Sequence, residues 1–262
     1  MRKYSMNMGR IVKIAKNVFG EAIRDRILYI IGLFALLMVA AVRLIPELSV
    51  GTDDKIILDF GLAAISILGL IVTVFIGTNL VNKEIEKRTV YILVAKPLSR
   101  SELIVGKHIG LSAVLAVLLI VMTVIYGLIL SLSGISYPIG SILVTVIFIF
   151  IQLSLLTAVA ILFGVFTSSL LATLFTFGIY LMGNLSRDLV KLGDLSDNPG
   201  IKKLMMGLYV ILPDLSRLNL KNDAVYGLLP SMANLVSNFG YALLYIILLL
   251  SITIAIFARR EF

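Results

Sequence analysis

Residues 139–166 read IGSILVTVIFIFIQLSLLTAVAILFGVF, and no charged side chain interrupts them. The hydrocarbon core of a bilayer is about 30 Å thick, and a helix needs about 20 apolar residues to cross it. A strand of a membrane barrel would instead alternate apolar and polar residues over about 10 positions. The stretch is therefore predicted to cross a membrane as one α-helix.

Similar apolar runs recur along the chain on both sides of this stretch. They predict an all-α membrane protein, a bundle of six transmembrane helices with an N-terminal amphipathic elbow helix. The expected spans are 27–45, 61–81, 109–131, 139–166, 169–185 and 237–258. The fourth and fifth spans are separated only by Thr167 and Ser168, which predicts a tight helical hairpin.

The composition excludes a soluble globular protein. Of the 262 residues, 60% are hydrophobic and 15% are charged, and the mean hydropathy is +1.06. Soluble domains have about 45–50% apolar and about 25% charged residues. The chain has no cysteine and one histidine, His108, so we expect no thiolate or multi-histidine metal site and no catalytic triad.

The basic residues are distributed unevenly, which predicts the orientation of the chain. The segments 1–26, 82–108 and 259–262 hold 15 of the 23 Lys and Arg residues, and 43–60 and 186–236 hold the other eight. Basic residues concentrate on the cytoplasmic side of a membrane. We therefore expect a multi-pass protein of the plasma (inner) membrane with both termini in the cytoplasm. This topology explains the net charge of +8 without nucleic acid as a partner.

The N-terminal segment 1–26 is amphipathic. Apolar residues recur at helical spacing between Ile11 and Ile23, and basic residues occupy the other side. A basic amphipathic helix before a span typically lies at the inner leaflet. The segment is interpreted either as a simple membrane anchor or as an elbow helix that positions the bundle against a cytoplasmic partner.

The chain is expected to form a single transmembrane domain over 1–262. Five spans lie in 27–185, and the sixth span and a cytoplasmic tail lie in 237–262. Between them is an outer loop, 186–236, whose run 201–212 is apolar but would be only about 18 Å long as a helix. We expect this run to form an interfacial or re-entrant helix that stops at the following proline.

The segment 82–108, NKEIEKRTVYILVAKPLSRSELIVGKH, joins the second and third expected spans. A helix is predicted over 84–95, and Pro97 stops it because the proline ring cannot continue the hydrogen-bond ladder. Ser99 and Glu102 have the spacing of a capping box, which predicts the start of a second helix. The segment is either a solvated basic loop or a rigid elbow that transmits force from a soluble partner into two spans.

Several positions of this loop follow the pattern of one transporter family. They are Glu84, Glu86, Arg88, Thr89, Tyr91 and Leu93, then Lys96, Pro97, Leu98, Ser99 and Arg100, then Gly106, Lys107 and Gly110. The loop resembles that of permease subunits of ABC exporters of the second integral-membrane class (ABC-2). Within this class it is most similar to the nitrous-oxide-reductase copper-maturation and gliding-motility permeases. Many members carry Gly where Arg88 stands, so this chain follows an Arg-Thr variant.

The resemblance implies an ATP-driven exporter in which this chain forms the translocation path. The implied partners are a cytoplasmic ATPase in two copies, a second permease copy or paralogue, the lipid bilayer, and in some assemblies a periplasmic or surface protein. The residues implied in coupling to the ATPase are Glu84, Glu86, Arg88, Thr89, Lys96, Pro97, Ser99, Arg100 and Lys107.

The chain itself has no means of hydrolysing ATP. A P-loop has the pattern G-x-x-x-x-G-K-[ST]. Here Gly106 and Lys107 are followed by His108, and Ser101 stands where the first glycine would be. We therefore expect no enzyme activity and no cofactor in this chain, and we expect ATP and magnesium to be used by the partner subunit.

Two other classes of function stay open as alternatives. An ion-coupled secondary transporter has an ionisable residue inside the bilayer, and within the expected spans only Arg43 qualifies. A membrane-embedded enzyme has paired carboxylates or a metal cluster, and the carboxylates of Asp53, Asp54 and Asp59 fall in an outer loop without a histidine.

Neutral polar residues inside the spans are the candidates for the transport path. Amides and hydroxyls in an apolar medium need a hydrogen-bond partner, which is supplied by a neighbouring helix or by a bound molecule. The residues selected on this ground are Asn79, Thr78, Gln152 and Thr157.

Overall fold

The computed structural model describes residues 7–24, 27–48, 53–86, 99–195 and 198–259. All regular elements in these ranges are helical, and they confirm the predicted all-α membrane bundle. They are α1 (Met8–Arg24), α2 (Ile27–Leu48), α3 (Asp53–Glu86), α5 (Arg100–Leu132), α6 (Ile139–Phe166), α7 (Ser169–Asn184), α8 (Ser186–Leu195), α9 (Pro199–Ile211), the 3-10 helix η1 (Leu215–Leu218), α10 (Lys221–Val225) and α11 (Met232–Arg259).

Five helices are long and apolar enough to cross a membrane: α2, α3, α5, α6 and α11. The fifth expected span, 169–185, corresponds to α7, which has 16 residues and is about 24 Å long, less than the thickness of a bilayer core. Helix α8 follows at an angle of 70° to α7, so that these two helices form at most one broken span. The described part of the chain therefore has five or six candidate spans.

Helices α3 and α5 are longer than the spans predicted within them. They contain 34 and 33 residues without a break. The predicted capped helix after Ser99 is therefore not a separate element but the first part of the third span, because no proline interrupts α5. Most of the predicted helix 84–95 lies outside the described residues.

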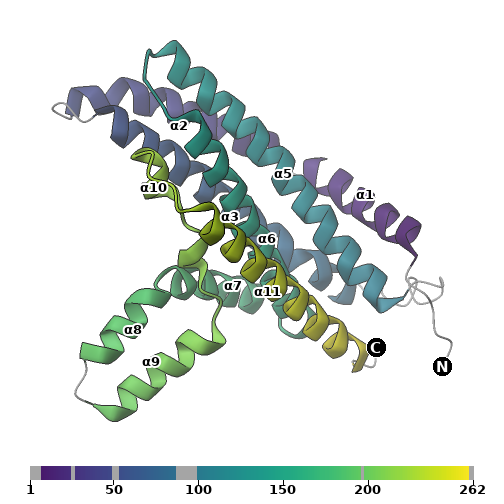
Figure 1. Cartoon of the computed structure of the whole chain (residues 1–262). Coiled ribbons are helices and arrows are strands. Elements are labelled where there is room, and N and C mark those ends of the chain that lie inside the picture. Colours follow the sequence, from purple (N-terminus) through teal and green to yellow (C-terminus); the bar gives the residue numbers. More distant parts are fainter. Residues whose placement is uncertain (1–6, 25–26, 49–52, 87–98, 196–197, 260–262) are drawn as a thin grey trace.

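The long helices run side by side, as Figure 1 shows, and the start of α1 and the end of α11 lie at one end of the bundle, which we call the terminal end. Helix α6 contacts α3, α5, α7 and α11 and is the central element. The core between these helices is aliphatic, with Ile65, Leu115 and Leu155 fully buried. Helices α8 and α9 lie against each other and project from the flank of the bundle (Figure 1).

The opposite end of the bundle is covered by α10. The hydroxyl of Thr145 in α6 donates a hydrogen bond to the carbonyl oxygen of Leu220, at 3.3 Å. The ammonium of Lys55 at the start of α3 lies 4.6 Å from the ring centroid of Tyr226. These contacts hold α10 over the first turns of α3 and α6.

Candidate coupling site at the terminal end

The first residues of α5 form the capping box that the sequence predicts. The Oγ atom of Ser99 accepts a hydrogen bond from the backbone N–H of Glu102 at 3.1 Å. The backbone N–H of Ser99 donates in return to Oε2 of Glu102 at 2.8 Å. Two of the otherwise unpaired donors at the helix start are thereby satisfied. The prediction is confirmed, and it fixes the point at which the segment 87–98 leads into α5.

The carboxylate of Glu102 has a second role that the cap alone does not explain. Its Oε1 atom accepts a hydrogen bond from the backbone N–H of Asn7, the residue before α1, at 2.8 Å. The guanidinium of Arg10 lies 3.8 Å from Oε2, and the side chain of Glu102 is fully buried. Glu102 therefore joins the start of α1 to the start of α5.

Helix α1 packs on α5 at two glycines one helical turn apart. A Cβ atom at Gly106 would lie 2.8 Å from Cβ of Ile14, and one at Gly110 would lie 2.8 Å from the carbonyl oxygen of Ala15 and from Cβ of Val18. Only hydrogen fits at these positions, so the two backbones approach as closely as in small-xxx-small packing of membrane helices.

The apolar face of α1 is directed at protein. Ile11, Val18 and Ala22 are 1%, 6% and 3% exposed, whereas Met8 and Val12 are 69% and 58% exposed. Figure 1 shows α1 alongside the first part of α5. Burial against α5 favours the elbow-helix interpretation over an anchor whose apolar face lies in lipid.

The side chain of Arg100 joins the same region to the last helix. Its Nη1 atom donates to the carbonyl oxygens of Phe257 and Ala258 at 2.5 and 2.7 Å. The guanidinium also lies 5.8 Å from the ring centroid of Phe257. The last carbonyls of a helix have no partner within the helix, so Arg100 caps the end of α11. Residues 99–102 thus connect α1, α5 and α11.

The sequence matches the family described as ABC-2 family transporter protein over residues 12–262. The chain belongs to the ABC-2 family. It is a membrane component of an ABC transporter, and this membership implies an ATPase partner. No curated protein matches the chain. The family match supports the ABC-2 class but not the narrower copper-maturation and gliding-motility group.

The predicted coupling residues of the permease are only partly within the described structure. Ser99 and Arg100 are half-buried at the start of α5. Lys107 is 2% exposed, so its side chain faces the interior of the permease and is not on the surface of a loop. Glu84 and Glu86 belong to the last turn of α3, and their side chains lie outside the description. The positions of Arg88, Thr89, Lys96 and Pro97 are also outside the described residues.

All four predicted path residues make hydrogen bonds within the bundle, and three of them, Asn79, Gln152 and Thr78, join two helices. Asn79 accepts a hydrogen bond from the hydroxyl of Ser169 at 2.6 Å, and the amide of Gln152 donates to Oδ1 of Asn184 at 3.2 Å. The hydroxyls of Thr78 and Thr157 donate to carbonyl oxygens of their own helices at 2.7 and 2.9 Å. These contacts give each of the four residues a hydrogen-bond partner within the permease, and a role in the path stays a prediction.

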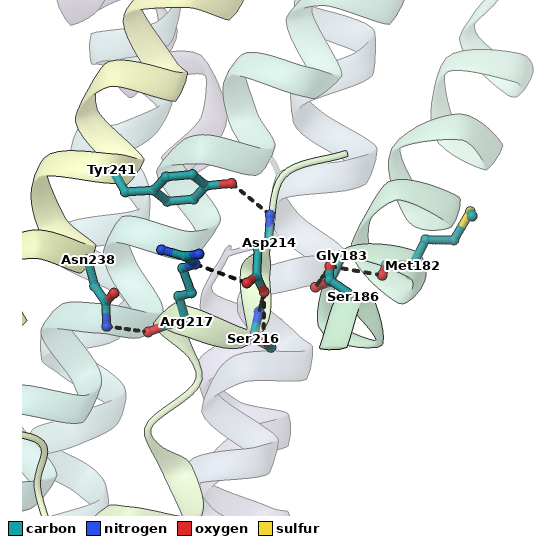
Figure 2. A network of polar contacts seen from close by, with 8 residues as sticks. All are labelled: Met182, Gly183, Ser186, Asp214, Ser216, Arg217, Asn238 and Tyr241. Atoms are coloured by element: carbon teal, nitrogen blue, oxygen red, sulfur yellow. Dashed lines mark hydrogen bonds and ion pairs between the residues drawn. The ribbon is translucent and has the colours of Figure 1, made fainter. Parts of the chain in front are cut away.

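The sequence-based reasoning missed a polar cluster where the chain returns from α9 to α11. Figure 2 shows Arg217, whose Nε atom donates to Oδ2 of Asp214 at 3.0 Å. The hydroxyl of Tyr241 accepts from the backbone N–H of Asp214 at 2.8 Å, and the amide of Asn238 donates to the carbonyl oxygen of Arg217 at 3.0 Å. The hydrogen bond to Asp214, and a second one to Tyr209, raise the pKa of Arg217. Asp214, Arg217 and Asn238 of this cluster line a cavity of about 350 Å³.

The sequence of the permease carries a signal for one part of the coupling site and none for another. The spacing of Gly106 and Gly110 is typical of close helix packing, although it does not name α1 as the neighbour. No local spacing of an acidic and a basic residue predicts the contact between Glu102 and Arg10, because these residues lie far apart in the sequence.

Proposed function

We propose that this ABC-2 permease is driven by its ATPase through the segment 87–98, which joins α3 to α5. The observation that supports this proposal is the set of contacts made directly after the segment. Glu102 binds the start of α1, and Arg100 binds the end of α11. A force applied to the segment would therefore move three elements together instead of deforming a free loop.

The two helices that flank the segment suit this role. Each is unbroken over 34 or 33 residues, a length of about 50 Å. This exceeds the bilayer core of about 30 Å, so each helix extends from the coupling region to the far side of the membrane. Without a hinge in between, a displacement at one end is passed to the other.

The proposed assembly contains two permease subunits, identical or paralogous, and two cytoplasmic ATPase subunits that bind ATP and magnesium. The two bundles enclose the path, and closure of the ATPase pair tilts α3 and α5 so that the path opens outward. The aliphatic interior favours export of an apolar or amphipathic cargo, or transmission of force to a surface protein. We also propose that the permease falls in the narrower group of copper-maturation and gliding-motility permeases, which its loop resembles.

One observation favours a second candidate, an ion-coupled secondary transporter. The ionisable residues Lys107 and His108 of α5 are buried, with exposed fractions of 2% and 8%. Buried ionisable residues in membrane proteins often mark ion pathways. Nε2 of His108, however, lies 3.0 Å from the carbonyl oxygen of Ser154, which gives it a structural partner. We therefore favour the ATP-driven function.

The test is reconstitution of the permease with its ATPase in lipid vesicles. We expect co-purification of the two proteins and ATP-dependent transport, and we expect both to be lost in Arg88→Glu. The matched control is Glu47→Lys, which reverses one exposed charge at the opposite end of the bundle and should leave both intact. Full binding by Arg88→Glu would contradict docking at the segment. Transport by the permease alone, driven by an ion gradient, would establish the second candidate.

A further inference from the structure

Helices α8 (Ser186–Leu195) and α9 (Pro199–Ile211) lie against each other, and we call this pair the flank arm. Asn184, the last residue of α7 before the arm, and Ile211, the last residue of α9, are each hydrogen-bonded to the centre of a long helix. At its entry, the Oδ1 atom of Asn184 accepts from Nε2 of Gln152 at 3.2 Å. At its exit, the carbonyl oxygen of Ile211 accepts from the hydroxyl of Tyr245 at 2.8 Å. Gln152 and Tyr245 are each the fourteenth residue of a 28-residue helix, α6 and α11 respectively.

These positions set the depth of the flank arm. A helix of 28 residues is about 42 Å long, and the bilayer core is about 30 Å thick. If both ends of α6 and α11 clear the core, their centres lie within about 6 Å of the bilayer midplane. The flank arm therefore starts and ends at the depth of the lipid chains, not at the membrane surface. Of the two interpretations of run 201–212, this depth favours a re-entrant helix over an interfacial one.

The flank arm leaves the bundle sideways. Helix α8 makes an angle of 70° with α7, and Figure 1 shows both arm helices projecting away from the long helices. No residue of α9 is buried in this chain. The depth of the arm therefore places a largely uncovered hairpin beside the bundle.

The surface of the flank arm suits neither lipid nor water. Two ion pairs lie on it, Lys202 with Asp194 at 2.9 Å and Lys191 with Asp188 at 3.2 Å, and their side chains are 58–74% exposed. Charged groups at this depth are costly in hydrocarbon.

Another side of α9 is apolar. Ile201, Leu204 and Ile211 follow one another at helical spacing, and they are 43%, 59% and 75% exposed. A contiguous apolar face of this kind marks a surface that lipid or another protein covers. The flank arm thus needs a neighbour that covers its apolar face and leaves its ion pairs in a polar space.

We propose that the flank arm packs against the bundle of a second permease subunit. The apolar face of Ile201, Leu204 and Ile211 contacts the helices of that subunit, and the ion pairs face the aqueous path between the two subunits. A soluble protein does not reach this depth, and lipid does not accommodate the ion pairs, which leaves a membrane-embedded polypeptide as the occupant. The inference rests on the dimer in the proposed function and adds the surface by which the two subunits meet.

The experiment uses the full transporter in native membranes, with the photoreactive residue p-benzoyl-phenylalanine introduced at Leu204. We expect irradiation to give a cross-linked product of about twice the mass of the 28.7 kDa chain. Lys203 of the same helix is the matched control position, and we expect at least fivefold less product there. Adducts with lipid alone at Leu204 would overturn the proposal, and so would a cross-link only to an unrelated protein.

A second measurement covers the case in which the probe disturbs assembly. The chain has no cysteine, so Lys203→Cys and Leu204→Cys each introduce a single thiol. We expect a membrane-impermeant maleimide to label Lys203→Cys at least tenfold faster than Leu204→Cys. Equal rapid labelling would place the arm in water, and labelling of neither would place it in lipid; either result refutes the proposal. If the ATPase co-purifies but the labelling or cross-linking results contradict the arm proposal, that proposal fails and the proposed function stands.

Discussion

The carboxylate of Glu102 accepts a hydrogen bond from the backbone N–H of Asn7 at 2.8 Å, although the two residues are 95 positions apart. The same carboxylate closes the capping box with Ser99. One side chain therefore determines both where α5 starts and where α1 is held. Because the side chain is fully buried, its hydrogen bonds are protected from competition with water, and this joint is stronger than a surface contact.

Replacing Glu102 with Ala should release α1 from α5. The change leaves the N–H groups of Asn7, which is exposed, and Ser99, which is half-buried, without their acceptor, and each lost hydrogen bond costs about 0.5–1.5 kcal/mol. We expect faster hydrogen exchange in α1, measured by mass spectrometry in detergent, and reduced stimulation of the ATPase. Glu21→Ala, at an exposed position of α1, is the control. If exchange in α1 rises equally in both variants, the joint at Glu102 is not what holds α1.

Replacing Gly110 with Ala should separate α1 from α5 by a different route. The added Cβ would lie 2.8 Å from the carbonyl oxygen of Ala15, and overpacking of this kind typically costs about 1–3 kcal/mol. We expect a lower midpoint of thermal unfolding in detergent. The control is Gly127→Ala in the same helix, where the nearest atom is 3.8 Å away; it should be neutral or slightly stabilising because alanine favours the helix.

Replacing Arg100 with Ala should loosen the end of α11. The variant removes both hydrogen bonds to the carbonyl oxygens of Phe257 and Ala258, and bonds that involve a charged group contribute about 1.5–3 kcal/mol each. We expect increased exchange confined to the last turn of α11. Arg259→Ala, which changes an exposed arginine of the same turn, should have little effect. Exchange that increases throughout the bundle would indicate general destabilisation instead.

The sequence predicts these features unequally, for physical reasons. The spans and the capping box depend on local patterns, since about 20 apolar residues and the pair Ser99 and Glu102 are visible in the sequence. The burial of Lys107 was not predicted, because a position in a basic loop does not reveal that α5 continues through it and is covered there.

The depth of the flank arm was also beyond sequence reasoning. Its apolar run is visible between 201 and 212, and so is the proline that follows it. Its location depends on the contacts of Gln152 and Tyr245 with the two ends of the arm. Such contacts join residues far apart in the chain, and hydrophobic periodicity does not report them.

Replacing Tyr245 with Phe should loosen the exit of the flank arm. The change removes the hydroxyl that donates to the carbonyl oxygen of Ile211, and a hydrogen bond of this kind contributes about 0.5–1.5 kcal/mol. We expect faster hydrogen exchange in α9 with unchanged exchange in α5. Tyr29→Phe, at a position that is 79% exposed, is the control. Unchanged exchange in α9 would show that the arm is held mainly by other contacts.

The orientation of the bundle is testable because the chain has no cysteine. Lys16 in α1 and Lys55 in α3 are both exposed, and they lie toward opposite ends of the bundle. The excess of basic residues near the terminal end predicts that this end faces the cytoplasm. A membrane-impermeant maleimide applied to intact cells should therefore label Lys55→Cys at once and Lys16→Cys only after permeabilisation. The reverse pattern would place the segment 87–98 outside the cell, where no ATP-driven partner could bind it, and the proposed coupling would be excluded.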